Sequence, residues 1–310
     1  MIRKFLDYIT IERHYSPLTV RAYEQDLKEF CSYLRVDPSA LNPGEVSDAD
    51  IKDWMISLLD AGEKPRTVRR KLSSLRSFWR FMLRVGYVDK DITRAIIAPK
   101  MDKPLPVFFK ESEMQRAQAT LDYADDFPSM RDSLIIDMLY QTGMREAEIV
   151  GLTDGDIDLV SKEVRVFGKR RKERIVPFGD ALAERIRTYQ ASRNEQFGLE
   201  PVPEQPLLLT DKGEKATVGT VYTIVRTRMG EVSTLKKHSP HVLRHTFATQ
   251  MLNNGADINT IKTLLGHSSL AATQVYTHTT FEQLKQAYRQ AHPRAQKDEQ
   301  TTPSNPTENE

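Results

Sequence analysis

The sequence predicts a mainly α-helical protein with one small β-sheet, an α+β arrangement divided into two domains. Apolar residues recur three or four positions apart through most of the chain, which is the spacing of amphipathic helices. Strand-like alternation is confined to residues 163–178. Three prolines, Pro99, Pro104 and Pro106, interrupt the pattern after the first third of the chain. A chain of 310 residues also fits about two domains.

The first domain, residues 1–98, is predicted to be helical. Ser16 precedes Pro17, a pair typical of a helix N-cap and its first helical position, and apolar residues then recur to Leu34. Cys31 lies beside this apolar stripe, so we interpret it as a small core residue rather than a reactive thiol. Its single thiol cannot form an intrachain disulfide.

Two more helices are predicted in this domain, one from the N-cap Ser47 to Gly62 and one from Lys64 to Arg84. The second carries eight basic residues and no acidic one, and its arginines cluster away from its apolar stripe. Solvated faces usually mix both signs, so unpaired cations of one sign indicate contact with the phosphates of a polyanion. The residues predicted to make these contacts are Arg66, Arg69, Arg70, Arg76 and Arg80, with an ordinary solvated face as the alternative.

Residues 99–107 are predicted to form an extended linker, because closely spaced prolines disfavour both helices and sheets. Residues 108–292 form the second domain. Residues 293–310 are predicted to be a disordered acidic tail, because they contain no large apolar residue and, from Lys297 onward, hold one lysine and four acidic residues.

Within the second domain, an apolar helical face precedes Gly143, and residues 163–167 and 174–178 alternate as two strands. The basic run at 169–172 lies between the strands and is therefore predicted to occupy the tip of a hairpin. From Ala181 the pattern is mostly helical to Gln290.

Composition excludes several classes of protein. Lys and Arg number 45 and Asp and Glu 43, giving a formal charge of +2, and 39% of residues are hydrophobic. No stretch approaches the ~18 apolar residues that span a membrane, and no secretory signal is visible after Met1. These features predict a soluble, cytoplasmic protein without a membrane partner.

The histidines raise the question of a metal site. His241 and His245 have the i, i+4 spacing of a zinc-protease helix, but Val242 stands where the catalytic Glu belongs. No third ligand follows at a recognisable spacing, so we predict neither a metal nor another cofactor. His241 and Arg244 share a helix face instead, which places an imidazole beside a guanidinium suited to bind phosphate.

In combination these features resemble the tyrosine recombinases of the lambda-integrase type, with the bacterial Xer proteins as the best match. Residues 142–152 (Thr-Gly-Met-Arg-Glu-Ala-Glu-Ile-Val-Gly-Leu) resemble the first arginine box of that family, and residues 241–245 resemble the second. His267 and Tyr276 match a later histidine position and the nucleophile. The resemblance covers nearly the whole chain, and it implies an N-terminal core-binding domain followed by a tyrosine-recombinase catalytic domain.

The resemblance implies a catalytic set of Arg145, Lys169, His241, Arg244, His267 and Tyr276. Tyr276 attacks the scissile phosphorus, forms a 3′-phosphotyrosyl link and releases a 5′-hydroxyl, so one ester replaces another without ATP. In a metal-free site the charge on the nonbridging oxygens must be met by cations, for which Arg145 and Arg244 are the candidates. His241 and His267 handle protons or orient the phosphate, and their two roles stay open.

The general acid for the 5′-oxygen is a hairpin lysine in this family, and Lys169 matches it best. The family commonly has glycine after that lysine, whereas Arg170 follows it here, so Lys172 stays open as the alternative. We also predict DNA contacts for Arg170, Arg171 and Lys172. Glu148 lies at i+3 from Arg145 and is predicted to hold its guanidinium.

The family resemblance also implies the partners. They are double-stranded DNA with a palindromic recombination site, and this chain or a second Xer-type recombinase in a tetramer on that DNA. A DNA translocase is a further candidate partner. The Xer-like length favours resolution of chromosome or plasmid dimers. The alternatives are an integrase or invertase of a mobile or phase-variable element, a topoisomerase, and a non-catalytic DNA-binding protein on the same fold.

Overall fold

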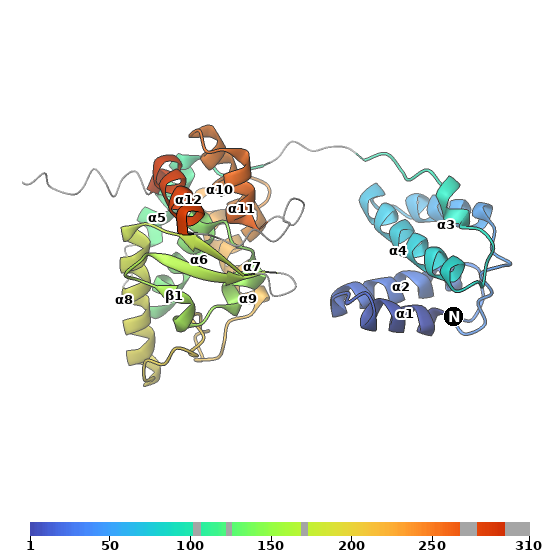
Figure 1. Ribbon diagram of the computed structural model, residues 1–310, viewed down its shortest axis with the longest axis horizontal. Helices are drawn as coiled ribbons and strands as arrows, with labels where there is room; N and C mark the ends of the chain where they lie inside the picture. The colour runs from blue at the N-terminus through green and yellow to red at the C-terminus, as the bar shows by residue number, and fades with distance from the viewer. Residues whose placement is uncertain (102–106, 122–125, 169–172, 267–277, 295–310) are drawn as a thin grey trace, which may run out of the picture. The chain divides into compact units, whose positions relative to one another are not determined.

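The computed structural model describes residues 1–101, 107–121, 126–168, 173–266 and 278–294. The chain divides into two compact units, Met1–Pro104 and Leu105–Glu310, called unit 1 and unit 2 (Figure 1). Both are mainly helical, which confirms the predicted fold class. Among the described residues, no helix is both long and apolar enough to cross a membrane.

Unit 1 is built around its last long helix. Its elements are α1 (Ile2–Ile11), α2 (Pro17–Tyr33), α3 (Asp48–Asp60), α4 (Pro65–Arg84) and the short 3-10 helix η1 (Ile92–Ala95). The apolar stripe of α4 packs against α1, α2 and α3, where Phe30 lies 5.0 Å from Trp54 between ring centroids. The opposite face of α4 is left to its polar and basic residues.

The predicted helix starts in unit 1 are confirmed. The Ser16 hydroxyl accepts a hydrogen bond from the backbone N–H of Thr19 (3.3 Å) at the start of α2. Ser47 and Asp50 form a reciprocal capping box at the start of α3. Cys31 is fully buried, as predicted, and burial raises the pKa of its thiol to about 11.

Unit 2 surrounds one central helix. Its helices are α5 (Glu111–Leu121), α6 (Phe127–Thr142), α7 (Glu146–Gly151), η2 (Asp154–Asp156), α8 (Asp180–Phe197), α9 (Val218–Val232), α10 (Pro240–Asn253), α11 (Ile258–Leu265) and α12 (His278–Ala291). Helix α6 contacts α5, α7, α8, α9 and α10. It is buried on nearly every side, so its polar residues must find partners inside the protein.

The small sheet has three antiparallel strands, β1 (Ile157–Asp158), β2 (Glu163–Phe167) and β3 (Glu173–Pro177), in the order β1-β2-β3. Strand β3 begins and ends one residue earlier than predicted. Val166 pairs with Arg174 across the hairpin, and both side chains are buried. A charged residue therefore takes an inward position in β3, where alternation alone predicts an apolar one.

Residue Arg294, in the predicted disordered tail, makes contacts with the rest of unit 2. His292 is fully buried and stacks on Tyr288 at 5.0 Å between ring centroids. Arg294 forms an ion pair with buried Asp137 (3.2 Å between Nη2 and Oδ1) and lies over the Tyr140 ring. The predicted disordered tail thus begins too early at residue 293, because these contacts reach back to α6. Residues 295–310 lie outside the described residues.

Gly143 ends α6 in the left-handed conformation, with φ +60°, and it sits in a crowded place. A Cβ there would lie 2.5 Å from Cδ1 of Phe247 and 2.8 Å from Cδ2 of Leu265. Gly198 ends α8 at the same φ, but nothing lies within 4 Å of its Cβ position. The two glycines share one backbone constraint and differ only in packing.

We predict that Gly143→Ala destabilises unit 2 far more than Gly198→Ala. Gly198→Ala is the control and should lose only the cost of a left-handed backbone, about 1 kcal/mol. Gly143→Ala should lose about 2 kcal/mol more through overpacking. Thermal unfolding of the full chain, followed by amide hydrogen exchange in α6 and α8, measures both. Equal losses in the two variants would contradict the role assigned to this close approach.

Candidate active site

Arg145 is placed by the tight turn that joins α6 to α7. It occupies the N-cap of α7, with an extended backbone at φ −80° and ψ 152°. The Glu148 carboxylate accepts hydrogen bonds from the Arg145 backbone N–H (2.9 Å) and from its Nη1 (2.7 Å). The prediction that Glu148 holds this guanidinium is confirmed. The Arg145 side chain nevertheless remains 45% exposed, so it can still meet a ligand.

Glu148 also binds a second arginine. Arg174 donates to both of its carboxylate oxygens, at 3.1 and 2.7 Å, and both side chains are 5% exposed. Burial acts to raise the pKa of Glu148, but the hydrogen bonds and charge of Arg174 and the hydrogen bonds of Arg145 outweigh burial and hold that pKa below its ordinary value. Glu148 is therefore ionised at neutral pH.

Arg244 lies within α10 and is 7% exposed. It donates from Nη1 to the carbonyl of Gly143 (2.6 Å) and from Nη2 to the carbonyl of Leu265 (2.7 Å). Burial, together with the charges of Arg145 and Arg174, lowers the pKa of Arg244 to about 10. These bonds use two of its five N–H groups, and no further partner occurs among the described residues.

The end of α11 is held by two of these arginines. Arg174 donates from Nε to the carbonyl of Leu264 (2.8 Å), next to the Leu265 carbonyl bound by Arg244. Gly266 then ends the helix at φ +63°, and a Cβ there would lie 3.2 Å from the Arg174 side chain. The chain therefore leaves α11 in a fixed direction, directly before His267.

This cluster carries an excess of positive charge. Glu148 binds Arg145 and Arg174, and Arg244 bonds to the nearby carbonyls of Gly143 and Leu265. Three guanidinium groups and one carboxylate leave a net charge of about +2 in a partly buried place. Such an arrangement favours a bound anion with several oxygens, because guanidinium forks match phosphate geometry.

His241 lies on the exposed side of this cluster, in the first turn of α10. Partial burial and the positive charges of Lys237, Arg244 and His245 lower its pKa. His241 is therefore mostly neutral at pH 7 and able to accept a proton or a hydrogen bond. A bound anion would raise the pKa of His241 again in part.

The sequence-based prediction omitted Arg174. The sequence does hold a signal for its burial. Arg174 lies two residues before Val176 in β3, so both side chains point to the same, inward face of the strand. Of the predicted catalytic residues, the structure brings together Arg145, His241 and Arg244. Lys169, Arg170, Arg171, Lys172, His267 and Tyr276 lie outside the described residues. No three His, Cys, Asp or Glu residues in the described ranges are arranged to hold a metal ion.

The arginines of α4 are less free than predicted. Arg70 is ion-paired with buried Asp26 (2.7 Å between Nη2 and Oδ1), so the expectation that it is unpaired is wrong. Asp26 lies 44 residues away, beyond the reach of a helical pattern. Arg69 and Arg76 donate to the carbonyls of Pro99 (3.0 Å) and Ile96 (2.7 Å).

Arg66 and Arg80 are exposed, and neither makes an ion pair or hydrogen bond with another described residue. They are therefore the members of the predicted set that are most available to DNA. Contact with DNA remains a prediction for all five arginines of the predicted set.

Comparison with known proteins places these residues in a family. The model of the phage integrase family matches residues 108–283, and that of the phage integrase N-terminal SAM-like domain matches residues 2–86. Tyrosine recombinase XerC of Chlorobaculum tepidum is 37% identical over 315 residues, covering 94% of each chain. Tyrosine recombinase XerC of Bacillus subtilis is 35% identical and covers 95% of this chain and 96% of its own.

Among solved structures, the Tn1549 transposon integrase in complex with transposon right-end DNA matches with a TM-score of 0.68. The two chains are 17% identical, and the match covers 92% of this chain and 98% of the other. At this identity the likeness concerns the fold.

We predict that Glu148→Gln destabilises unit 2 by about 3 kcal/mol at pH 7, because it leaves two buried or half-buried arginines without their charge partner. The folded-state pKa of Glu148 lies below its ordinary 4.5, so its stabilisation is present above pH 4.5 and lost as the pH falls through the folded value. The free energy of unfolding should therefore fall less steeply with acid in the variant than in the wild type.

Glu184→Gln is the matched control, since Glu184 pairs with Arg187 on the exposed face of α8. Its loss should stay below about 0.5 kcal/mol. Denaturant unfolding between pH 3 and 7 measures all three proteins. If both substitutions cost the same, Glu148 does not organise the cluster.

Proposed function

This chain belongs to the phage integrase family as a tyrosine recombinase of the XerC type, and we propose that it resolves chromosome dimers by cutting and rejoining DNA through Tyr276. Its activity is that of a site-specific recombinase. The observation that carries the proposed chemistry is the pairing of Arg145 and Arg174 with the single Glu148 carboxylate, beside Arg244 on the carbonyls of Gly143 and Leu265. That cluster is built to receive a phosphate.

The reaction exchanges one phosphate ester for another. The Tyr276 oxygen attacks the scissile phosphorus, a bond forms between them, and the bond to the 5′-oxygen breaks. The tyrosine proton goes to a base, and the departing 5′-oxygen receives a proton from an acid. The 5′-hydroxyl of a second strand then reverses these steps, so the bond energy is retained throughout.

The arginines stabilise the charge on the nonbridging oxygens during both steps. Arg145 reaches the phosphate from the exposed edge of its guanidinium, while Glu148 holds the opposite edge. Arg244 supplies the N–H groups that do not bind the carbonyls of Gly143 and Leu265. Arg174 acts through Glu148 and the end of α11, and is a positioning residue. Removing one preorganised donor typically costs roughly 3 kcal/mol in the transition state.

We assign proton transfer to two histidines and a lysine. His241 accepts the tyrosine proton or binds a nonbridging oxygen, which its lowered pKa permits at neutral pH. His267 follows directly after the anchored end of α11 and shares this role. Lys169 protonates the 5′-oxygen as general acid, with Lys172 as the alternative.

The substrate is double-stranded DNA with a palindromic recombination site. Two such duplexes need four protomers, so the active assembly is a tetramer of this chain, alone or with a second Xer-type recombinase. Helix α12 contacts α10, α11 and β3 of its own chain, and it resembles the segment that family members exchange between neighbours. A DNA translocase is a further partner, and the reaction takes place in the cytoplasm.

We predict that the protein forms a covalent adduct with a nicked suicide duplex and that Tyr276→Phe forms none. The nick lets the short 5′-hydroxyl fragment diffuse away, so the phosphotyrosyl intermediate accumulates. Denaturing gels measure the adduct, and peptide mass spectrometry locates it. The duplex carries a palindromic Xer-type site, with a scrambled duplex as the substrate control.

Tyr288→Phe is the matched control variant, because Tyr288 is a buried tyrosine of α12. It should retain the adduct. An adduct that persists in Tyr276→Phe would overturn the assignment of the nucleophile, and relaxation of supercoiled DNA without any preferred site would favour a topoisomerase.

A further inference from the structure

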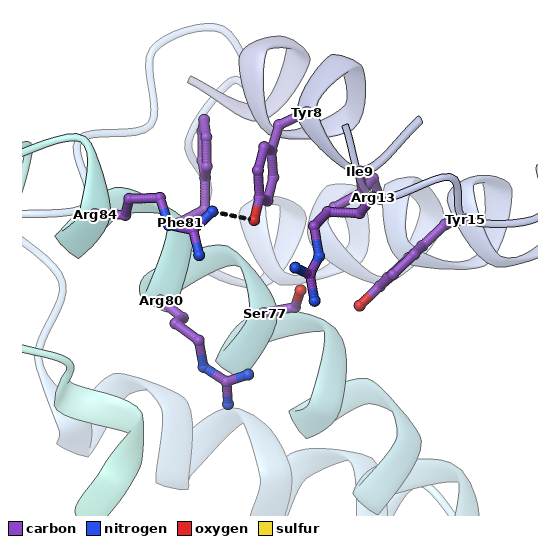
Figure 2. Close-up of a pocket in the computed structure, with 8 residues that line it drawn as sticks. All are labelled: Tyr8, Ile9, Arg13, Tyr15, Ser77, Arg80, Phe81 and Arg84. Carbon is purple, nitrogen blue, oxygen red and sulfur yellow. Dashed lines mark hydrogen bonds between the residues drawn. The ribbon is translucent and has the colours of Figure 1, made fainter. Parts of the chain in front are cut away.

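A pocket in unit 1 gathers three arginines without an acidic side chain. It lies between α1, the turn after α1, and the second half of α4, and the residues used below are Tyr8, Arg13, Tyr15, Ser77, Arg80 and Arg84 (Figure 2). The structure describes every residue of 1–101, and none of the described residues that line this pocket is acidic. The catalytic cluster contains none of these residues.

Helix α4 supplies one wall through its periodicity. Ser77, Arg80 and Arg84 are spaced i, i+3 and i+7, which places them along one face of the helix. The other wall comes from the end of α1. There the backbone N–H of Arg13 donates to the carbonyl of Tyr8 (3.1 Å), and that of Tyr15 to the carbonyl of Ile9 (2.9 Å). These bonds fix the turn that carries Arg13 to the pocket.

Arg84 is held in place before any ligand arrives. Its Nη1 donates to the Tyr8 hydroxyl, and its guanidinium lies 5.2 Å from the centre of the Tyr8 ring. That ring is stacked on Phe81, at 4.7 Å between centroids and an interplanar angle of 21°. A guanidinium supported in this way loses less conformational freedom on binding than an unsupported one.

Arg13 and Arg80 have no such partner. Both are exposed, and neither makes a side-chain hydrogen bond or ion pair within unit 1. Elsewhere on α4 the protein does neutralise its cations, since Arg70 pairs with Asp26 and Lys71 with Glu63 at 2.6 Å. Like charges that line one pocket without a counter-charge destabilise the free protein and favour binding of an anion.

The size and chemistry of the pocket restrict that anion. Its volume is about 50 Å³, which is room for one phosphate group. Figure 2 shows the Tyr15 and Ser77 hydroxyls on the same side as the Arg13 guanidinium, where they can add hydrogen bonds to phosphate oxygens. The phosphate of a longer molecule fits best, because the pocket is open to solvent.

We propose that this pocket binds one backbone phosphate of duplex DNA, with Arg13, Arg80 and Arg84 as its ligands. The proposal rests on the proposed function, which supplies the DNA. It adds Arg13 and Arg84, with the Tyr15 and Ser77 hydroxyls, to the DNA-binding residues of unit 1. A contact to the backbone sets position on the duplex and carries no sequence information.

The test measures the affinity of the full chain for two fluorescent duplexes, one selected by the protein from a random library and one of random sequence, between 50 and 300 mM salt. The variant Arg13→Gln/Arg80→Gln should bind both duplexes about tenfold more weakly at 100 mM salt. Its slope of log affinity against log salt should fall by about one, the value for one lost phosphate. Arg84→Gln should also lower the affinity and the salt slope.

Arg3→Gln is the control, because Arg3 is an exposed arginine of α1 outside the pocket. It removes one positive charge, as Arg84→Gln does, and should change affinity less than twofold. Unchanged thermal unfolding of each variant establishes that folding is intact. A salt slope equal to that of the wild type, or a loss no larger than in Arg3→Gln, overturns the proposal.

A second arm locates the phosphate and separates its sources. Single methylphosphonates, which carry no charge, are placed in turn along the selected duplex. At one position the neutral linkage should weaken the wild type but not Arg13→Gln/Arg80→Gln. If instead inorganic phosphate binds the wild type and no duplex position shows this coupling, the pocket serves a free anion and the DNA assignment is wrong. The Tyr276 adduct of the wild type tests the proposed function independently.

Discussion

Glu148 holds two arginines with one buried carboxylate, and the geometry of the candidate active site follows from that constraint. Both oxygens bind Arg174, and both also bind Arg145, through its Nη1 and its backbone N–H. A carboxylate in this position can be ionised only because the arginines outweigh its desolvation. The arginines in turn can be brought together only because the carboxylate screens them. A buried carboxylate without the arginines, or the arginines without the carboxylate, would destabilise the fold.

The same arginines connect the parts of unit 2 that must meet at a phosphate. Arg244 joins the turn after α6 to the end of α11, and Arg174 joins β3 to that same end. Hydrogen bonds to buried guanidinium groups therefore hold both the turn before Arg145 and the end of α11. Arg174 and Arg244 are buried and bind backbone carbonyls, whereas the Arg145 side chain is 45% exposed and is the most available of the three to a ligand.

Local patterns predicted much of this arrangement, and long-range partners account for the rest. The N-caps at Ser16 and Ser47, the helix end at Gly143 and the hairpin follow from neighbouring residues. Spacing on one helix also predicted that Glu148 holds Arg145. By contrast, the pairing of Arg70 with Asp26, the burial of Arg174, the anchoring of Arg294 on Asp137 and the pocket between α1 and α4 depend on residues brought together only by folding.

The central claim is that the arginine cluster acts by neutralising the scissile phosphate, and a charge-neutral substrate tests it most directly. Single-turnover adduct formation is measured for the wild type and Arg145→Ala on a phosphodiester and on a methylphosphonate at the scissile position. On the diester the variant should be slower on the order of 10²-fold or more. On the methylphosphonate, where one negative oxygen is missing, the two proteins should differ by less than about tenfold. An equal loss on both substrates would contradict the account.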